Sequence, residues 1–150
     1  MREKLRVIGR RDRIDLPELG YWDIKAKVDT GAYGSALHCS EIKVVSRNGK
    51  NCLSFLLLDP EHPEFREEVH FAEHFSEKVV KNSSGEAEQR YIIKTEVVIF
   101  GKSIYTDFSL TDRRDMKYPI LLGRKFLRKR FIVDVRRKDV SYKFKKKNQQ

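Results

Sequence analysis

A carboxylate, a hydroxyl and a glycine follow one another at Asp29, Thr30 and Gly31. Residues 24–28, which precede them, alternate between apolar and charged side chains, and this pattern predicts a half-buried strand that ends at the carboxylate. Gly31 and Gly34 predict a turn in which the backbone can approach a ligand or another chain closely. A carboxylate held at the end of a strand is a candidate general base for activating a water molecule.

A second motif lies about ninety residues further along the chain, where an apolar segment ends in Gly-Arg. Together the two segments resemble the active-site loop and the supporting strand of retropepsin-like aspartic peptidases. By this resemblance, the downstream strand packs beneath the loop around Asp29. Two motifs in the right order are a stronger signal than either alone, because short motifs recur by chance. Besides the Asp-Thr-Gly residues, the matching positions are Ala32 and Ser35 in the loop and Leu122, Gly123 and Arg124 downstream.

The resemblance implies a shared active site. Aspartic peptidases use two carboxylates about 3 Å apart that share one proton, because like charges so close cannot both ionise. The chain carries one Asp-Thr-Gly sequence, so we expect a two-fold homodimer in which both copies of Asp29 meet on the axis. Thr30 would hydrogen-bond across the axis, and the Gly31 carbonyl would face the substrate backbone. The expected function is an aspartic endopeptidase that acts on a peptide or protein substrate.

The sequence departs from the viral enzymes beside this loop. In those relatives an acid follows the alanine and pairs with the arginine of the downstream motif. Tyr33 and Gly34 occupy these places here, so Arg124 must find another partner or face the substrate. An arginine that faces the substrate would favour an acidic peptide, such as a glutamate-rich tail.

The chain resembles one bacterial family more closely than the viral enzymes. This family is usually labelled an ATP-dependent zinc protease, its fold is retropepsin-like, and its genes are often associated with a ribosome-modifying glutamate ligase. The resemblance covers residues 5 to about 135. It rests on the segments 8–11, 15–20, 25–38, 90–93 and 110–124.

The ATP part of this label is not matched by the residues. A phosphate-binding loop needs a glycine five positions before its Gly-Lys-Ser/Thr sequence. Glu96 stands in that position before Gly101, Lys102 and Ser103. Because the flanking residues favour strands, these three predict a hairpin turn. We expect no ATP site and no cofactor.

The zinc part has a closer match. His70, Glu73 and His74 fit the inverted His-x-x-Glu-His motif, which on a helix presents two imidazoles beside a glutamate base. Such a site needs a third ligand on a neighbouring helix, and the segments that follow favour strands. We therefore expect no metal site. A zinc-dependent peptidase that uses His70 and His74 is the alternative function.

Short strands separated by turns predict the fold. Asn48-Gly49 lies between two β-rich segments, and this dipeptide is the strongest short hairpin signal. Gly101-Lys102 predicts a second hairpin. We expect one domain over residues 1–150, with an all-β, retropepsin-like closed barrel and one short C-terminal helix.

Three segments bear on the details of this fold. Residues 65–76 fit either a helix or a strand. Residues 124–130 predict the short basic helix. The alternating apolar residues 140–144 predict a last strand.

Positive charge is concentrated toward the C-terminus. The chain has a formal net charge of +10, and residues 113–147 hold fifteen Lys/Arg and three Asp/Glu, a local balance of +12. This asymmetry suggests RNA, a ribosome or an acidic peptide as a partner of the basic C-terminal segment, residues 124–150. A solubilising tail is the simpler interpretation. A non-catalytic binding module with an inherited Asp-Thr-Gly loop is the third candidate function. Phosphate contacts would involve Arg128, Lys129, Arg130, Arg136, Arg137 and Lys138.

The composition argues against several other classes of protein. Hydrophobic residues make up 39% and charged residues 36% of the chain, as in ordered, soluble domains. The first ten residues contain no apolar segment of the kind found in signal peptides, and no apolar run approaches the length of a membrane span. Cys39 and Cys52 fit reduced thiols. We therefore expect a cytoplasmic protein that does not contact a membrane.

Overall fold

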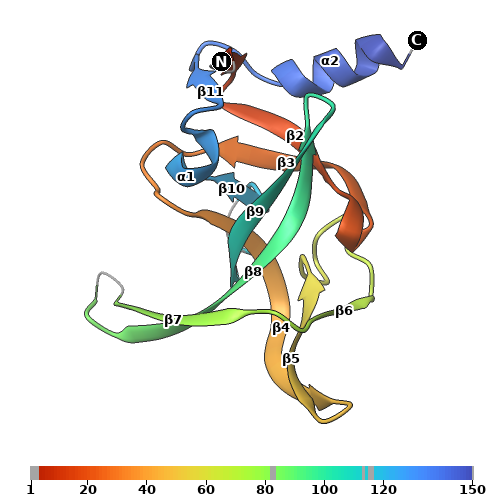
Figure 1. The fold of residues 1–150 in the computed structure, drawn as a ribbon, viewed down its shortest axis with the longest axis vertical. Coiled ribbons are helices and arrows are strands. Elements are labelled where there is room, and N and C mark those ends of the chain that lie inside the picture. The colour runs from red at the N-terminus through yellow and green to blue at the C-terminus, as the bar shows by residue number, and fades with distance from the viewer. Residues whose placement is uncertain (1–3, 82–83, 113, 115–116, 150) are drawn as a thin grey trace.

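Short strands make up most of the chain (Figure 1). The structure is a computed structural model and describes all residues except 1–3, 82–83, 113, 115–116 and 150. Its strands are β1 (Arg6–Ile8), β2 (Arg11–Leu16), β3 (Tyr21–Val28), β4 (Ser35–Arg47), β5 (Lys50–Leu57), β6 (Val69–Ala72), β7 (Ser76–Lys81), β8 (Ala87–Ile99), β9 (Lys102–Thr111), β10 (Ile120–Leu122) and β11 (Phe131–Val133). Its helical elements are the 3₁₀ turn Pro17–Leu19, α1 (Arg124–Leu127) and α2 (Val140–Asn148). The expected all-β fold class is confirmed.

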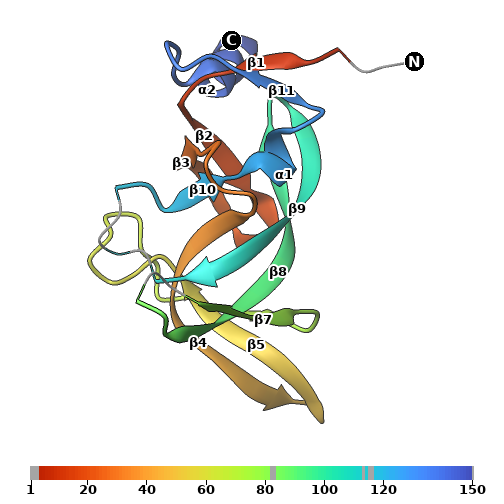
Figure 2. The same cartoon turned by 90° about the vertical axis from the view of Figure 1, so that its left-hand side faces the viewer.

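Strand β10 closes a ring of strands. It pairs in parallel with β3, where Ile120 lies opposite Ala26, and antiparallel with β4, where Ile120 lies opposite Leu37. The order β10–β3–β2–β8–β9–β4 therefore returns to β10. The expected closed barrel is present as this ring but not as a regular barrel, because β2 and β8 meet at a single register pair, Asp15 and Val98. Strands β5, β6 and β7 extend the sheet beyond the ring (Figure 2).

Tight turns with left-handed backbone fix the register of two hairpins. Asn48 and Gly49 join β4 to β5 with φ angles of +52° and +77°. Phe100 and Gly101 join β8 to β9 with φ angles of +51° and +71°. Positive φ at both central residues matches the right-handed twist of the strands. Both hairpins lie where the sequence predicts them.

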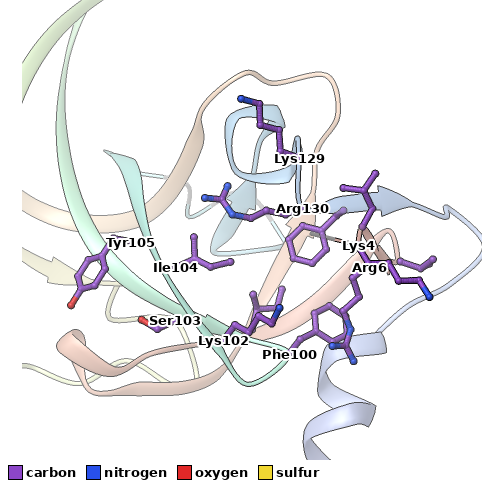
Figure 3. Close-up of a pocket in the computed structure, with 13 residues that line it drawn as sticks. Lys4, Arg6, Phe100, Lys102, Ser103, Ile104, Tyr105, Lys129 and Arg130 are labelled. Carbon is purple, nitrogen blue, oxygen red and sulfur yellow. The ribbon is translucent and has the colours of Figure 1, made fainter. Parts of the chain in front are cut away.

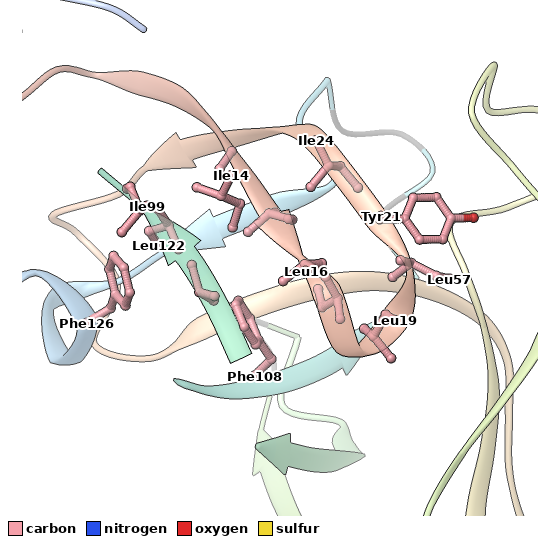
Figure 4. Close-up of a cluster of buried hydrophobic side chains, with 14 of the residues drawn as sticks. Ile14, Leu16, Leu19, Tyr21, Ile24, Leu57, Ile99, Phe108, Leu122 and Phe126 are labelled. Atoms are coloured by element: carbon pink, nitrogen blue, oxygen red, sulfur yellow. The ribbon is translucent and has the colours of Figure 1, made fainter. Parts of the chain in front are cut away.

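The core lies between the strands of the ring (Figure 4). Along β3, Ile24 and Ala26 are buried whereas Lys25 between them is exposed, as the alternating pattern predicts. Burying one large apolar side chain stabilises the fold by about 1.5–3 kcal/mol. The ring therefore holds β3, β4 and β10 firmly in place around the start of the loop that contains Asp29. Large members of this cluster are Ile14, Leu16, Phe55, Phe108 and Leu122.

Residues 140–144 form the start of helix α2, so the expected strand is wrong. The cause is a contact from far away in the sequence. The Ser141 and Tyr142 N–H groups donate to the buried carboxylate of Asp12 over 2.8 and 3.0 Å. A carboxylate at a helix N-terminus satisfies free N–H groups and complements the helix dipole. The expected short basic helix is found as α1, and neither helix is long and apolar enough to cross a membrane in the described part of the chain.

A buried ionisable pair joins β4 to the loop that follows β5. His38 and Asp59 are 2% and 4% exposed, and His38 Nε2 lies 2.6 Å from Asp59 Oδ2. The hydrogen bond with His38 lowers the pKa of Asp59 below its usual value. A carboxylate whose pKa is lower in the folded than in the unfolded chain stabilises the fold above about pH 4, and this contribution is lost as pH falls through the folded-state pKa.

The His38→Ala variant is expected to lower the free energy of unfolding by about 3–5 kcal/mol at pH 7, because Asp59 would stay buried without this partner. The loss should shrink as pH falls below about 4, because the stabilising contribution of ionised Asp59 disappears as pH falls through its lowered folded-state pKa. Arg136→Ala is the matched control. Arg136 also lowers the pKa of an aspartate, Asp134, but the arginine side chain is exposed, so little or no loss of stability is expected. Urea unfolding at pH 7 and pH 3 measures both variants. If the two variants lose equal amounts of unfolding free energy, the prediction is contradicted.

Candidate active site

The Asp29 loop joins the end of β3 to the start of β4. The Asp29 N–H donates to the Leu122 carbonyl over 2.9 Å, so the first residue of the loop is attached to β10. The Gly31 N–H donates to Asp29 Oδ1 over 3.0 Å, which fixes the direction of the carboxylate. A Cβ atom at position 31 would lie 3.2 Å from this oxygen, so glycine leaves room for it. The carboxylate is half-buried, while Thr30 and Gly31 are exposed.

Backbone contacts join the loop to the downstream motif. The Gly123 N–H donates to the buried Ser35 hydroxyl over 3.0 Å, and the Arg124 N–H donates to the Ala32 carbonyl over 2.8 Å. A Cβ atom at position 123 would lie 2.3 Å from the Gly34 carbonyl oxygen, so only glycine permits this approach. The two motifs, far apart in the sequence, therefore form one packed unit. This arrangement agrees with the packing that the resemblance implies.

Arg124 finds a backbone partner in place of an acid. Its Nη1 donates to the Thr30 carbonyl over 3.0 Å, and its guanidinium lies 5.9 Å from the centre of the Tyr33 ring. The guanidinium of Arg128 lies 5.6 Å from the same ring centre. Arg124 remains exposed, so its charge stays available at the edge of the loop.

A cavity of about 780 Å³ lies beside the loop. Loop residues 32–36 form one side, and the segment before β7 together with residues of β7, β8, β9, β10 and α1 supplies the remainder. Its acid, Asp107, is already paired with Lys125 at a distance of 2.9 Å. The cavity therefore has an excess of positive charge and suits an acidic chain. Its cations are Lys78, Arg90, Lys94 and Lys125.

The sequence argument did not assign Lys78 and Lys94 to the site. A signal for part of this wall was present, because Arg90, Ile92 and Lys94 alternate along a segment that favours a strand and so share one face. Lys78 carried no such signal, since it lies in β7, which pairs with β8 beside the loop only in the folded chain.

The zinc alternative is not supported by the local structure. His70 lies in strand β6 and stacks on Phe55 with ring centres 5.6 Å apart, and burial lowers its pKa. His74 lies after this strand and lines the cavity instead. The helix that would bring both imidazoles to one face is therefore replaced by a strand and a loop. Among the residues that the structure describes, no group of three or more His, Cys, Asp and Glu side chains could hold a metal ion.

Known proteins are similar to this chain in fold and in sequence. Its fold is similar to that of Lpg0085 from Legionella pneumophila, a protein of unknown function, with a TM-score of 0.73 and 22% identity over 92% of this chain and 99% of that one. Probable alpha-L-glutamate ligases from Desulfotalea psychrophila and Shewanella pealeana are each 34% identical, over 86% and 85% of this chain. The chain spans only 28% of the length of these two relatives. Residues 7–144 match the RimB-like family, described as retropepsin-like aspartic endopeptidase RimB, and the chain therefore belongs to this family.

Proposed function

We propose that this protein is an aspartic endopeptidase in which Asp29 from two copies of the chain forms the catalytic pair. The observation that carries the proposal is the Asp29 loop: the Gly31 N–H directs the half-buried carboxylate, and the Asp29 backbone N–H is bonded to β10. A single carboxylate cannot act as both acid and base at once. A two-fold dimer supplies the second one.

The reaction follows from one proton shared by two carboxylates. The ionised carboxylate takes a proton from water while the water oxygen attacks the scissile carbonyl carbon. The protonated carboxylate gives its proton to the carbonyl oxygen, and a tetrahedral diol forms. This intermediate breaks down when the carboxyl group that took the proton from water gives it to the amide nitrogen, the carbon–nitrogen bond breaks, and a diol hydroxyl returns its proton to the other carboxylate. Because the active pair carries one proton, activity should follow a bell-shaped pH profile.

An acidic peptide is the substrate class that fits the cavity. Lys78, Arg90 and Lys94 line it, and its one lining carboxylate is already paired with Lys125. Arg124 adds a further exposed charge beside the loop. The relatives named as probable alpha-L-glutamate ligases contain a region similar to this chain, which supports a glutamate-rich segment as the substrate.

A subunit-mixing experiment tests the shared pair. Wild type mixed with a fourfold excess of Asp29→Asn should retain about one fifth of its activity per wild-type chain, because most wild-type chains would then have an inactive partner. A mixture with Asp134→Asn, which changes an aspartate outside the loop, should retain full activity. The readout is cleavage of a labelled glutamate-rich peptide. Unchanged activity in the first mixture, with subunit exchange demonstrated by mass spectrometry, would rule out the shared pair.

A further inference from the structure

A second cavity, of about 700 Å³, lies where β1, β11 and the β8–β9 hairpin meet (Figure 3). It shares no lining residue with the cavity beside the Asp29 loop. Of the described residues that line it, none has an acidic side chain. Its cations are Lys4, Arg6, Lys102, Lys129 and Arg130.

These cations have no counter-charge among the residues that the structure describes. In the part of the chain that the structure describes, no carboxylate lies within ion-pair distance of any of the five. Lys129 also has a φ angle of +69°, a left-handed conformation that a lysine adopts rarely. Strained backbone of this kind is retained where the surroundings hold it, and it is frequent at binding sites.

Two of the guanidinium groups are fixed by contacts with the protein. The Arg6 guanidinium lies 4.2 Å from the ring centre of Phe100 and 4.4 Å from that of Phe144. Arg130 Nη1 donates to the Phe126 carbonyl over 3.0 Å. Cations that are already ordered lose less conformational entropy when a ligand binds.

A neighbouring hollow of about 520 Å³ extends the positive surface along α2. The two hollows share Arg6 and Phe100, so they meet at the ordered guanidinium. Among the described residues, no acidic side chain lines this second hollow either. We call the two hollows together the basic groove. The second hollow adds Arg136, Arg137, Lys138, Lys143 and Lys147.

The far end of the first hollow carries a serine and a tyrosine rather than cations. Figure 3 shows Ser103 and Tyr105 at this end, with Lys102 and Arg130 between them and Arg6. The Tyr105 hydroxyl donates to Glu18 over 3.5 Å, and the Ser103 hydroxyl donates to Glu96. These glutamates would repel a chain that carries a carboxylate on every residue. Tyr105 is 59% exposed, and its ring offers a flat apolar face to a neutral aromatic group.

We propose that the basic groove binds single-stranded nucleic acid. The phosphates of the bound strand lie along Arg6, Lys102, Lys129 and Arg130, and one of its bases stacks on Tyr105. A positive groove that follows the backbone, together with an aromatic platform for a base, is the arrangement by which proteins bind single strands. An acidic peptide would satisfy the cations but not the end with Tyr105, Glu18 and Glu96.

Salt dependence of binding provides the first test. A fluorescein-labelled 12-nucleotide oligo(U) or oligo(dT) is titrated with the protein at several salt concentrations, and anisotropy is measured. Lys102→Ala combined with Lys129→Ala should reduce the slope of log K against log salt by about 1.4, because each phosphate contact on a single strand contributes about 0.7. The matched control is Lys43→Ala with Lys50→Ala on the exposed β4–β5 hairpin, which should leave the slope unchanged.

Tyr105 and a competing peptide provide the second test. Tyr105→Ala should weaken oligonucleotide binding roughly tenfold, whereas Tyr105→Phe, which keeps the ring, should bind like wild type. Hexaglutamate should fail to displace the oligonucleotide at equal concentration. Tighter binding of oligo(U) than of oligo(dT) would identify RNA as the occupant, and the reverse would identify DNA. Absence of binding at 50 mM salt, equal slopes in the two lysine pairs, or displacement by hexaglutamate would each overturn the proposal.

Discussion

Asp29→Asn is expected to lower the rate of peptide-bond hydrolysis by about 10²- to 10⁴-fold, the range for loss of a catalytic acid or base. Asparagine has nearly the same shape as aspartate, and its oxygen can still accept the Gly31 N–H that now binds Asp29 Oδ1. The loop should therefore keep its structure. What is lost is the group that takes a proton from water.

Initial rates with a labelled glutamate-rich peptide measure this effect, with Asp134→Asn as the control that should retain wild-type activity. The free energy of unfolding of the Asp29 variant should stay close to that of wild type. A chelator should not change the activity of the wild type, because the proposed reaction uses carboxylates and water alone. Full activity of Asp29→Asn, or a loss of activity in the chelator, would refute the proposed mechanism.

Gly123→Ala is expected to abolish most activity and to lower the free energy of unfolding by about 1–3 kcal/mol, the range for one methyl group too many in a packed site. The new Cβ would lie 2.3 Å from the Gly34 carbonyl oxygen and 2.7 Å from that of Tyr33. Both are backbone atoms and cannot rotate away. Either β10 or the loop must move, and the Asp29 N–H would separate from the Leu122 carbonyl that now accepts it.

Gly34→Ala is the matched control on the other side of the same contact. A Cβ atom at position 34 would meet no atom within 4 Å, and the backbone there is not left-handed. Thermal unfolding and peptide cleavage should therefore distinguish two glycine-to-alanine changes that lie in one packed unit. If the two variants unfold at the same temperature and cleave the peptide at the same rate, the close approach of Gly123 to the loop is not needed for the stability or the activity of the site.

Local signals in the sequence predicted the parts of the fold that depend on neighbouring residues. Asn48-Gly49 specified a hairpin because its backbone preference is local. The alternation in residues 24–28 placed β3 for the same reason. The Asp-Thr-Gly loop and the downstream Gly-Arg segment were predicted to pack together, and the structure brings them into contact.

Distant contacts decided what the sequence did not predict. Helix α2 depends on Asp12, which lies 129 positions before Ser141, so residues 140–144 alone suggested a strand. Strand β2 contains Arg11, Asp12, Arg13 and Asp15, and this polar composition does not indicate a strand. The strand is defined instead by its pairing with β3. One cation of the cavity beside the loop, Lys78, lies in β7, which reaches the site only through its pairing with β8.

The attachment of the Asp29 loop to β10 also sets when the site can form during synthesis. The strand that holds the loop is made about ninety residues after Asp29. At 5–20 residues per second, the nascent chain therefore carries Asp29 for roughly 5–20 s before its supporting strand exists. The packed unit that holds the Asp29 loop therefore forms only after β10 has been synthesised.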